Sequence, residues 1–214
     1  MDNLILPSYY FGPVSWYVAC LQGNPPLIHQ GLTYRKQQFF SRMHIRHAQG
    51  VLPLSLPIHR RGERKPLKEK QISYQENWPR HHWRSIRFAY QNAPYFLYYE
   101  EELMEIYTRR PRYLVEWHEA CLEWTCEALG IDMPDSTIEE PGLPAAQKWH
   151  QQFDPTLNQQ PVWMKPASYT QVFPGFYPGL SILDLICNLG PESAAWLRQA
   201  LDAERWEKNN RPGL

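Results

Sequence analysis

The first thirty residues constrain the fold most, because they have the pattern of a strand, a helix and a second strand. "NLILP" and "PLIHQG" are short apolar runs, and "GPVSWYVACLQG" between them tolerates proline in the first turn of a helix and ends on glycine. This succession is typical of parallel α/β units, whose ligands gather where a strand ends and a helix begins. The segment "PSYYFGP" lies there, and Tyr9, Tyr10 and Trp16 are therefore candidates to stack on a ligand.

Later segments predict mainly helices. "NWPRHHWRSIRFAYQ", "YFLYYEEELMEIY" and "RYLVEWHEACLEWTCEALG" have helical spacing or helix-end signals, as do "SILDLICNLG" and "PESAAWLRQALDAERW". "GVLPLSLPIH" indicates an edge or bulged strand, because its prolines lack a donor for strand pairing. "RRGERKPLKEK" indicates an exposed loop, "DMPDSTIEEPGLP" another loop, and residues 145–177 show no period.

We therefore expect an α/β fold, with a small mixed sheet in the N-terminal half and helices dominating the C-terminal half. An α+β fold is the alternative. Residues 1–214 would form a single domain, with 205–214 as a frayed tail. No run is long and apolar enough for a membrane span, and the N-terminus has no secretory pattern, so we expect a soluble, cytoplasmic protein. Four scattered cysteines indicate reduced, buried thiols.

The net charge of zero hides a strong asymmetry. Residues 35–87 contain thirteen Lys or Arg and three acids, whereas residues 98–140 contain twelve acids and three Arg. The two segments either attract each other across the fold, or the basic one faces phosphates. Lys36 and Arg42 stand beside Phe39 and Phe40, a combination that suits a nucleotide or sugar nucleotide. Nucleic acid is disfavoured, since no nucleic-acid-binding module is visible in a neutral chain.

A polar trio interrupts the apolar segment "FYPGLSILDLICNLG". Ser181 and Asp184 have the spacing of a helix N-cap, which is the favoured interpretation. Asn188 lies one turn further on the same side, where a cap has no use for it. A pocket-lining stripe of all three residues is therefore the alternative.

The histidines indicate acid–base chemistry more than metal binding. No cysteine pair or HExxH motif accompanies them, and we expect no metal site. His82 lies in a basic helix on the same face as Tyr90, and nearby cations favour its neutral form. It is a candidate general acid or base, although a buried, hydrogen-bonded histidine is the simpler interpretation.

Five segments in order resemble the WbqC-like family, a bacterial group often met in gene clusters for surface polysaccharide. They are "LPSYYFGPVSWYVACLQ", "YRKQQFFSRMHI", "LSLPI", "NWPRHHWRSIRFAYQNAPYF" and "FYPGLSILDLICNLG". The resemblance covers about residues 4–107 and 169–197. It selects Lys36, Arg42, His82, Tyr90, Ser181, Asp184 and Asn188. The chain departs from the family at His29 and Gln30, where relatives carry an acidic pair, and this departure implies a changed substrate or lost activity.

The resemblance implies a role in cell-envelope glycan biosynthesis. Our hypothesis is a transferase that acts on an amino sugar carried by a nucleotide, with Lys36 and Arg42 holding phosphates. His82 would move a proton, and Asp184 would orient His82 or the substrate. The other hypothesis is a non-catalytic binding or assembly protein that recruits an anionic partner through the basic segment.

Overall fold

The computed structural model describes residues 4–22, 25–59, 65–137, 142–153 and 160–210, without the side chains of 207–210. Its strands form two sheets. The first is parallel, in the order β1-β2-β5, and the second is the antiparallel hairpin β3-β4, in which Met43 lies opposite Leu54. The bounds are β1 (Ile5–Pro7), β2 (Leu27–His29), β3 (Arg42–His47), β4 (Gly50–Ser55) and β5 (Ser136–Thr137).

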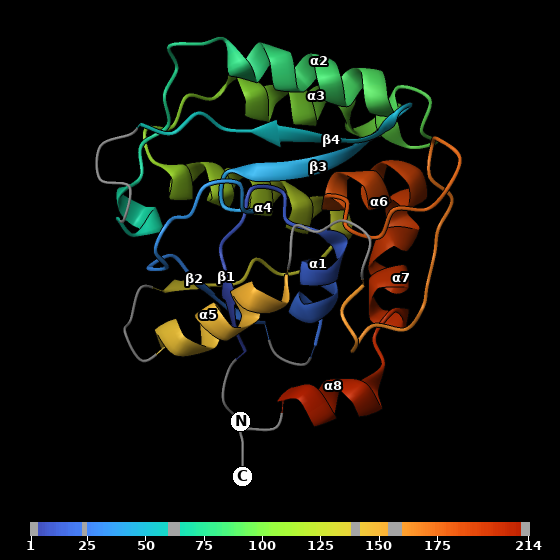
Figure 1. Cartoon of the computed structure of the whole chain (residues 1–214). Coiled ribbons are helices and arrows are strands. Elements are labelled where there is room, and N and C mark those ends of the chain that lie inside the picture. Colours follow the sequence, from blue (N-terminus) through green and yellow to red (C-terminus); the bar gives the residue numbers. More distant parts are fainter. Residues whose placement is uncertain (1–3, 23–24, 60–64, 138–141, 154–159, 211–214) are drawn as a thin grey trace.

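Helices make up most of the second half, which confirms the predicted α/β class (Figure 1). The α-helices are α1 (Val14–Cys20), α2 (Trp78–Tyr90), α3 (Phe96–Thr108), α4 (Leu114–Leu129), α5 (Leu143–Gln152), α6 (Ile182–Leu189), α7 (Ser193–Gln199) and α8 (Ala203–Asn210). Two short 3-10 helices are η1 (Leu67–Glu69) and η3 (Gly190–Glu192). No helix of the described ranges is both long and apolar enough to cross a bilayer.

The predicted strand–helix–strand opening is confirmed, since α1 connects β1 to its parallel neighbour β2. The third strand, β5, lies in a segment that we expected to be a loop. It is only two residues long, too short for an alternating pattern, and is held by a 2.7 Å bond from the backbone N–H of Ile28 to the carbonyl of Asp135.

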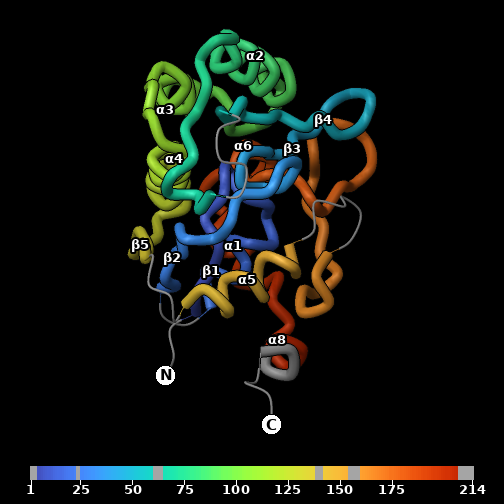
Figure 2. The backbone as a smooth tube through the Cα atoms, turned by 60° about the vertical axis from the view of Figure 1, so that its left-hand side comes forward, coloured from blue at the N-terminus to red at the C-terminus, as the bar shows by residue number. Residues whose placement is uncertain are grey.

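The helices are arranged in layers around the two sheets. In Figure 1, α2 and α3 cover the β3-β4 hairpin, α4 and α6 lie beneath it, and α5 lies across β1 and β2. Figure 2 shows from another side that α5 runs alongside β1 and α1. Helix α4 carries much of the core, because Leu114, Trp117 and Cys121 are completely buried on one face. All four cysteines are buried and unpaired, as predicted.

Three segments differ from their sequence patterns. The helix expected at residues 191–206 is divided into η3, α7 and the start of α8. Helix α8 extends into the expected tail as far as Asn210, and residues 211–214 lie outside the described ranges. The loop expected to be exposed at residues 60–70 instead buries Leu67 and Lys70. The ammonium group of Lys70 lies 4.9 Å from the ring centre of Tyr34. Residues 60–64 of that loop lie outside the described ranges.

Candidate functional site

Three consecutive hydroxyl side chains follow β1, and each is hydrogen-bonded to Nδ1 of a histidine from a different helix. These histidines belong to α4, α5 and α2, far away in the sequence. The pairs are Ser8–His118 at 2.8 Å, Tyr9–His150 at 2.6 Å and Tyr10–His82 at 3.0 Å. We call residues 8–10 with these partners the hydroxyl–histidine segment. It occupies the carboxyl end of a parallel strand, where ligands of α/β proteins gather.

The backbone of this segment is strained at its end. Phe11 is completely buried and has a φ of 37°, a left-handed conformation that costs a non-glycine residue about 1–3 kcal/mol. Its ring packs edge-on against Trp124, with centroids 5.9 Å apart. Such strain persists only where the surroundings impose it, and it clusters at functional sites.

The Ser8–His118 pair is enclosed. The Nε2 atom of His118 lies 2.6 Å from the carbonyl oxygen of Phe40, which only accepts, so Nε2 carries the proton and Nδ1 accepts the Ser8 hydroxyl proton. Burial lowers the pKa of His118 to about 4, which leaves it neutral. The void beside Ser8 measures about 10 Å³, room for roughly one water. The arrangement resembles a serine activated by a base, but no substrate fits beside it.

The Tyr10–His82 pair is also enclosed. The Tyr10 hydroxyl lies 2.7 Å from that of Tyr107, and the ring of Trp78 packs 5.1 Å from that of His82. Burial lowers the pKa of His82 to about 4, and a hydrogen bond to the backbone of Ser55 opposes this shift. At neutral pH, His82 is therefore an uncharged member of a buried polar network.

The Tyr9–His150 pair borders an open hollow of about 460 Å³. His150 is only partly buried, and Phe40 stacks on its ring with centroids 4.3 Å apart and an interplanar angle of 21°. Desolvation, assisted by the positive charge of Arg35, lowers the pKa of His150 to about 4. The other residues that line the hollow are Leu32, Thr33, Tyr34, Arg35, Leu143, Gln147 and Gln151. We call this space the α5 hollow.

The protonation of the pair determines what His150 offers to a ligand. Burial raises the pKa of Tyr9 well above its ordinary value, so the phenol keeps its proton. We assign that proton to the bond with Nδ1 of His150, and the proton of the neutral imidazole is then on Nε2. His150 can therefore present an N–H donor to a ligand in the α5 hollow. Together with the guanidinium of Arg35, this donor suits anionic oxygen atoms.

The two cations predicted to hold phosphates do not line the α5 hollow. Lys36 is exposed and follows Arg35 directly, whereas Arg42 donates from Nε to the Ser55 hydroxyl at 3.0 Å on β3. Trp16 is buried, and its indole N–H donates to the carbonyl of Pro7 at 2.9 Å. Sequence reasoning missed Arg35 as the cation of the hollow, although it stands in the same basic segment.

Asp184 forms a second polar centre on α6. Its carboxylate is completely buried, accepts a 2.7 Å bond from the Tyr169 hydroxyl through Oδ2, and has no partner at Oδ1. Burial raises its pKa to about 6, against the opposing effects of Tyr169, Tyr90 and Arg46. The Tyr90 hydroxyl also accepts from the backbone N–H of Arg46 at 3.3 Å. A carboxyl with this pKa exchanges its proton near neutral pH.

Ser181 is the N-cap of α6, as predicted. Its hydroxyl accepts from the backbone N–H of Leu183 at 3.3 Å, while Asn188 donates 2.7 Å from its amide to the backbone carbonyl of Asp184. The side chain of Asp184 takes no part in the cap, because it turns to Tyr169. The polar trio therefore contains one cap, one intrahelical bond and one separate carboxyl centre.

The structure gives His82 and Asp184 different partners. His82 bonds Tyr10, whereas the residue of α2 that approaches Asp184 is Tyr90. Tyr90 lies eight positions after His82, which corresponds to about 12 Å along the helix. Within the described residues, no three side chains of the His, Cys, Asp and Glu types are arranged to hold a metal ion.

Comparison with known proteins relates the chain to one protein family. A model of the "WbqC-like protein family" matches residues 8–156 and 150–195. The chain is similar to "Uncharacterized protein Rv1507c" of Mycobacterium tuberculosis (strain ATCC 25618 / H37Rv), with 24% identity over 201 residues, 80% of this chain and 87% of that protein. No solved structure matches the chain significantly.

Proposed function

Because the chain belongs to the WbqC-like protein family, we propose that it is an enzyme of cell-surface polysaccharide or modified-sugar biosynthesis. In this proposal it is a transferase that acts on a nucleotide-linked amino sugar. The observation that carries the proposal is the α5 hollow, an opening of about 460 Å³ that is lined by Arg35 and by His150, whose ring is hydrogen-bonded to Tyr9 from behind. That volume is within the range of small-molecule sites.

Arg35 binds the diphosphate in this proposal. Its guanidinium is always charged and offers a planar fork of donors that matches phosphate oxygens. Lys36 follows in the same exposed turn and adds positive charge for the incoming anion, as Arg42 does from β3. The exposed side chains of Gln147 and Gln151 on α5 offer amide groups to the sugar hydroxyls.

His150 stabilises the leaving group. When an acceptor attacks the transferred group, negative charge develops on the departing phosphate oxygen, and a fixed N–H donor lowers the energy of that charge. Since its pKa is about 4, His150 acts at neutral pH as a hydrogen-bond donor, and Tyr9 holds its ring and tautomer. His150 is therefore a candidate catalytic residue, and Tyr9 is a positioning residue.

The proton released by the acceptor needs a base. Of the two proposed groups, His82 and Asp184, the second is favoured, because its pKa is about 6 and because His82 is already hydrogen-bonded to Tyr10 and to the backbone of Ser55. Tyr90, Tyr169 and Asn188 would keep Asp184 in place. This part of the proposal requires a substrate that reaches both α5 and α6.

Calorimetric titration with uridine diphosphate N-acetylglucosamine tests the binding step. We expect Arg35→Gln and His150→Gln each to weaken binding by about tenfold or more, as for a lost hydrogen bond to a charged group. Lys148→Gln is the matched control, because Lys148 is an exposed cation of α5 that does not line the hollow. Equal affinities of all three variants would contradict the proposal.

The alternative function is a non-catalytic binding or assembly protein that recruits an anionic partner. The exposure of Arg35 and Lys36 favours it, since both side chains are accessible to a macromolecule. It predicts that His150→Gln leaves the function intact while Arg35→Gln weakens recruitment in a salt-dependent way. A transferase loses turnover in both variants.

A further inference from the structure

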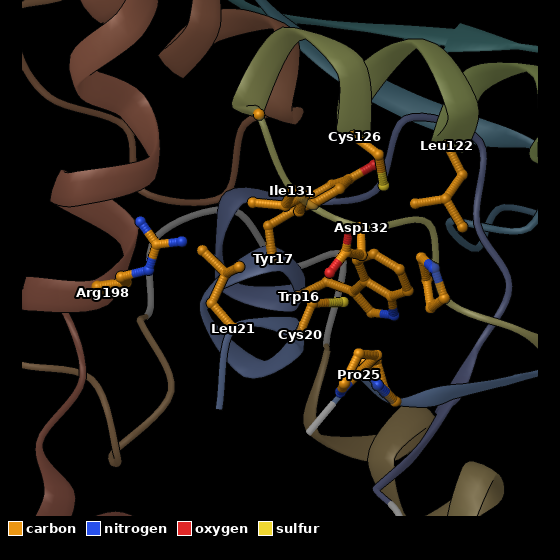
Figure 3. A pocket seen from close by; sticks show the side chains of 13 residues that line it. Trp16, Tyr17, Cys20, Leu21, Pro25, Leu122, Cys126, Ile131, Asp132 and Arg198 are labelled. Atoms are coloured by element: carbon orange, nitrogen blue, oxygen red, sulfur yellow. The ribbon is translucent and has the colours of Figure 1, made fainter. Parts of the chain in front are cut away.

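A second cavity lies at the opposite end of β2 from the α5 hollow. It measures about 310 Å³ and is formed by the ends of α1 and α4, the chain entering β2, and Arg198 of α7 (Figure 3). The α5 hollow follows the carboxyl end of β2, whereas this cavity precedes the amino end of the same strand. No step of the proposed transferase function uses this cavity. We call it the α1–α4 pocket.

Most residues that line the α1–α4 pocket have apolar or aromatic side chains, and polar atoms of the same lining are exposed beside them. Trp16 and Tyr17 pack against each other, with ring centroids 4.7 Å apart, and the indole N–H of Trp16 is fixed on Pro7. The other uncharged lining residues are Cys20, Leu21, Pro25, Pro26, Leu122, Cys126, Gly130, Ile131 and Pro134. Such a lining holds the apolar body of a ligand, and its polar atoms orient that ligand.

One part of the pocket favours a cation. Helix α4 ends here at Gly130, in the left-handed conformation with φ 61°, and its last turn contains no basic residue to offset the partial negative charge of a helix C-terminus. Asp132 follows with an exposed carboxylate, and Figure 3 shows this carboxylate beside Trp16. A carboxylate, a helix C-terminus and an aromatic ring together are suited to an ammonium group.

The other part favours an anion. Arg198 is exposed on α7 and lines the same pocket, and Figure 3 shows it across from Asp132, beyond Leu21. The pocket therefore has opposite charges at separate positions, with apolar walls between them.

We propose that the α1–α4 pocket is a second ligand site, which takes a small organic zwitterion. The ammonium group lies between Asp132 and Trp16, the apolar body lies on Tyr17 and Leu122, and the acid group pairs with Arg198. This assignment is independent of the proposed transferase function, because the two cavities share no lining residue.

Three probes of one length test this proposal by calorimetric titration. 6-Aminohexanoate carries both charges, hexylamine only the ammonium and hexanoate only the acid. We expect 6-aminohexanoate to bind most tightly, hexylamine more weakly and hexanoate most weakly. Asp132→Asn weakens the first two probes by about two- to fivefold, the effect of an exposed charge pair. Arg198→Gln weakens 6-aminohexanoate and leaves hexylamine unchanged.

Two further variants make the test specific. Asp135→Asn is the matched control, an exposed acid of the same segment outside the lining, and we expect it to bind all three probes normally. Ile131→Trp narrows the pocket and abolishes binding. The proposal is overturned if no probe binds, if hexanoate binds as tightly as 6-aminohexanoate, or if Asp132→Asn changes nothing. Arg35→Gln should not affect these titrations, which keeps their outcome separate from that of the α5 hollow.

Discussion

The three hydroxyl–histidine pairs have the same chemistry but different access. Ser8–His118 and Tyr10–His82 lie among buried side chains, whereas Tyr9–His150 borders the α5 hollow. Burial lowers the pKa of all three histidines to about 4. The difference lies in the second ring nitrogen, which His118 places on a backbone carbonyl and His150 can offer to a ligand.

This comparison separates architecture from function within one segment. The enclosed pairs join α4 and α2 to the end of β1, and they keep that end rigid. In the open pair, Tyr9 fixes the ring of His150, so that the Nε2–H donor of His150 is held in position at the α5 hollow. A preorganised site requires such a fixed donor. Variants of the enclosed pairs should therefore lower stability, and variants of the open pair should lower ligand binding.

The largest expected effect comes from the Ser8–His118 pair. His118→Phe leaves the Ser8 hydroxyl and the Phe40 carbonyl buried without partners, and we expect the free energy of unfolding to fall by about 4 kcal/mol. His150→Phe leaves only the Tyr9 hydroxyl without its partner, and His150 itself is partly exposed. The free energy of unfolding should therefore fall by about 1 kcal/mol. Urea denaturation of both variants measures the difference, and equal losses would mean that access does not distinguish the pairs.

Asp184 provides a buried group with the opposite pH dependence from the histidines. Its pKa rises from 3.8 to about 6 on folding, so its stabilising contribution is complete below about pH 4 and is lost as the pH rises through 6. The stability advantage of the wild type over Asp184→Asn should fall by about 2 kcal/mol between pH 4 and pH 7. Denaturation at several pH values measures this change, and a constant difference would show that the carboxyl is not perturbed.

The two tyrosines of the segment should separate stability from binding. Tyr10→Phe leaves His82 and the Tyr107 hydroxyl without their shared partner, so we expect a loss of about 2 kcal/mol and unchanged sugar-nucleotide binding. Tyr9→Phe should lower the free energy of unfolding by about 1 kcal/mol. It should also weaken sugar-nucleotide binding, because His150 loses the hydrogen bond that fixes its tautomer. Denaturation and calorimetry on both variants check this, and a normal affinity of Tyr9→Phe would remove its positioning role.

The smallest effect is expected at Arg42. Its bond to the Ser55 hydroxyl is exposed, and Arg42→Gln should change stability by less than about 0.5 kcal/mol. Because Arg42 does not line the α5 hollow, affinity should fall by less than about twofold, the loss of a distant, screened charge. A tenfold weaker affinity by calorimetry would show that the phosphates lie nearer to β3 than we propose.

Local patterns in the sequence predicted the frame of the site. The end of β1 was expected to be the ligand locus because a parallel strand followed by a helix places it there, and Ser181 was expected to cap α6. The histidine partners could not be predicted, because they lie 110, 141 and 72 residues from the hydroxyls that they bind. Both α5 and Tyr169 belong to segments without a readable period, so the hollow and the partner of Asp184 were missed as well.

The most direct test of the account observes the three histidines while a ligand binds. In the ¹⁵N spectrum of the histidine rings, we predict that uridine diphosphate N-acetylglucosamine shifts the Nε2 signal of His150 and leaves the signals of His118 and His82 in place. Saturable binding with an unchanged His150 signal would contradict the account.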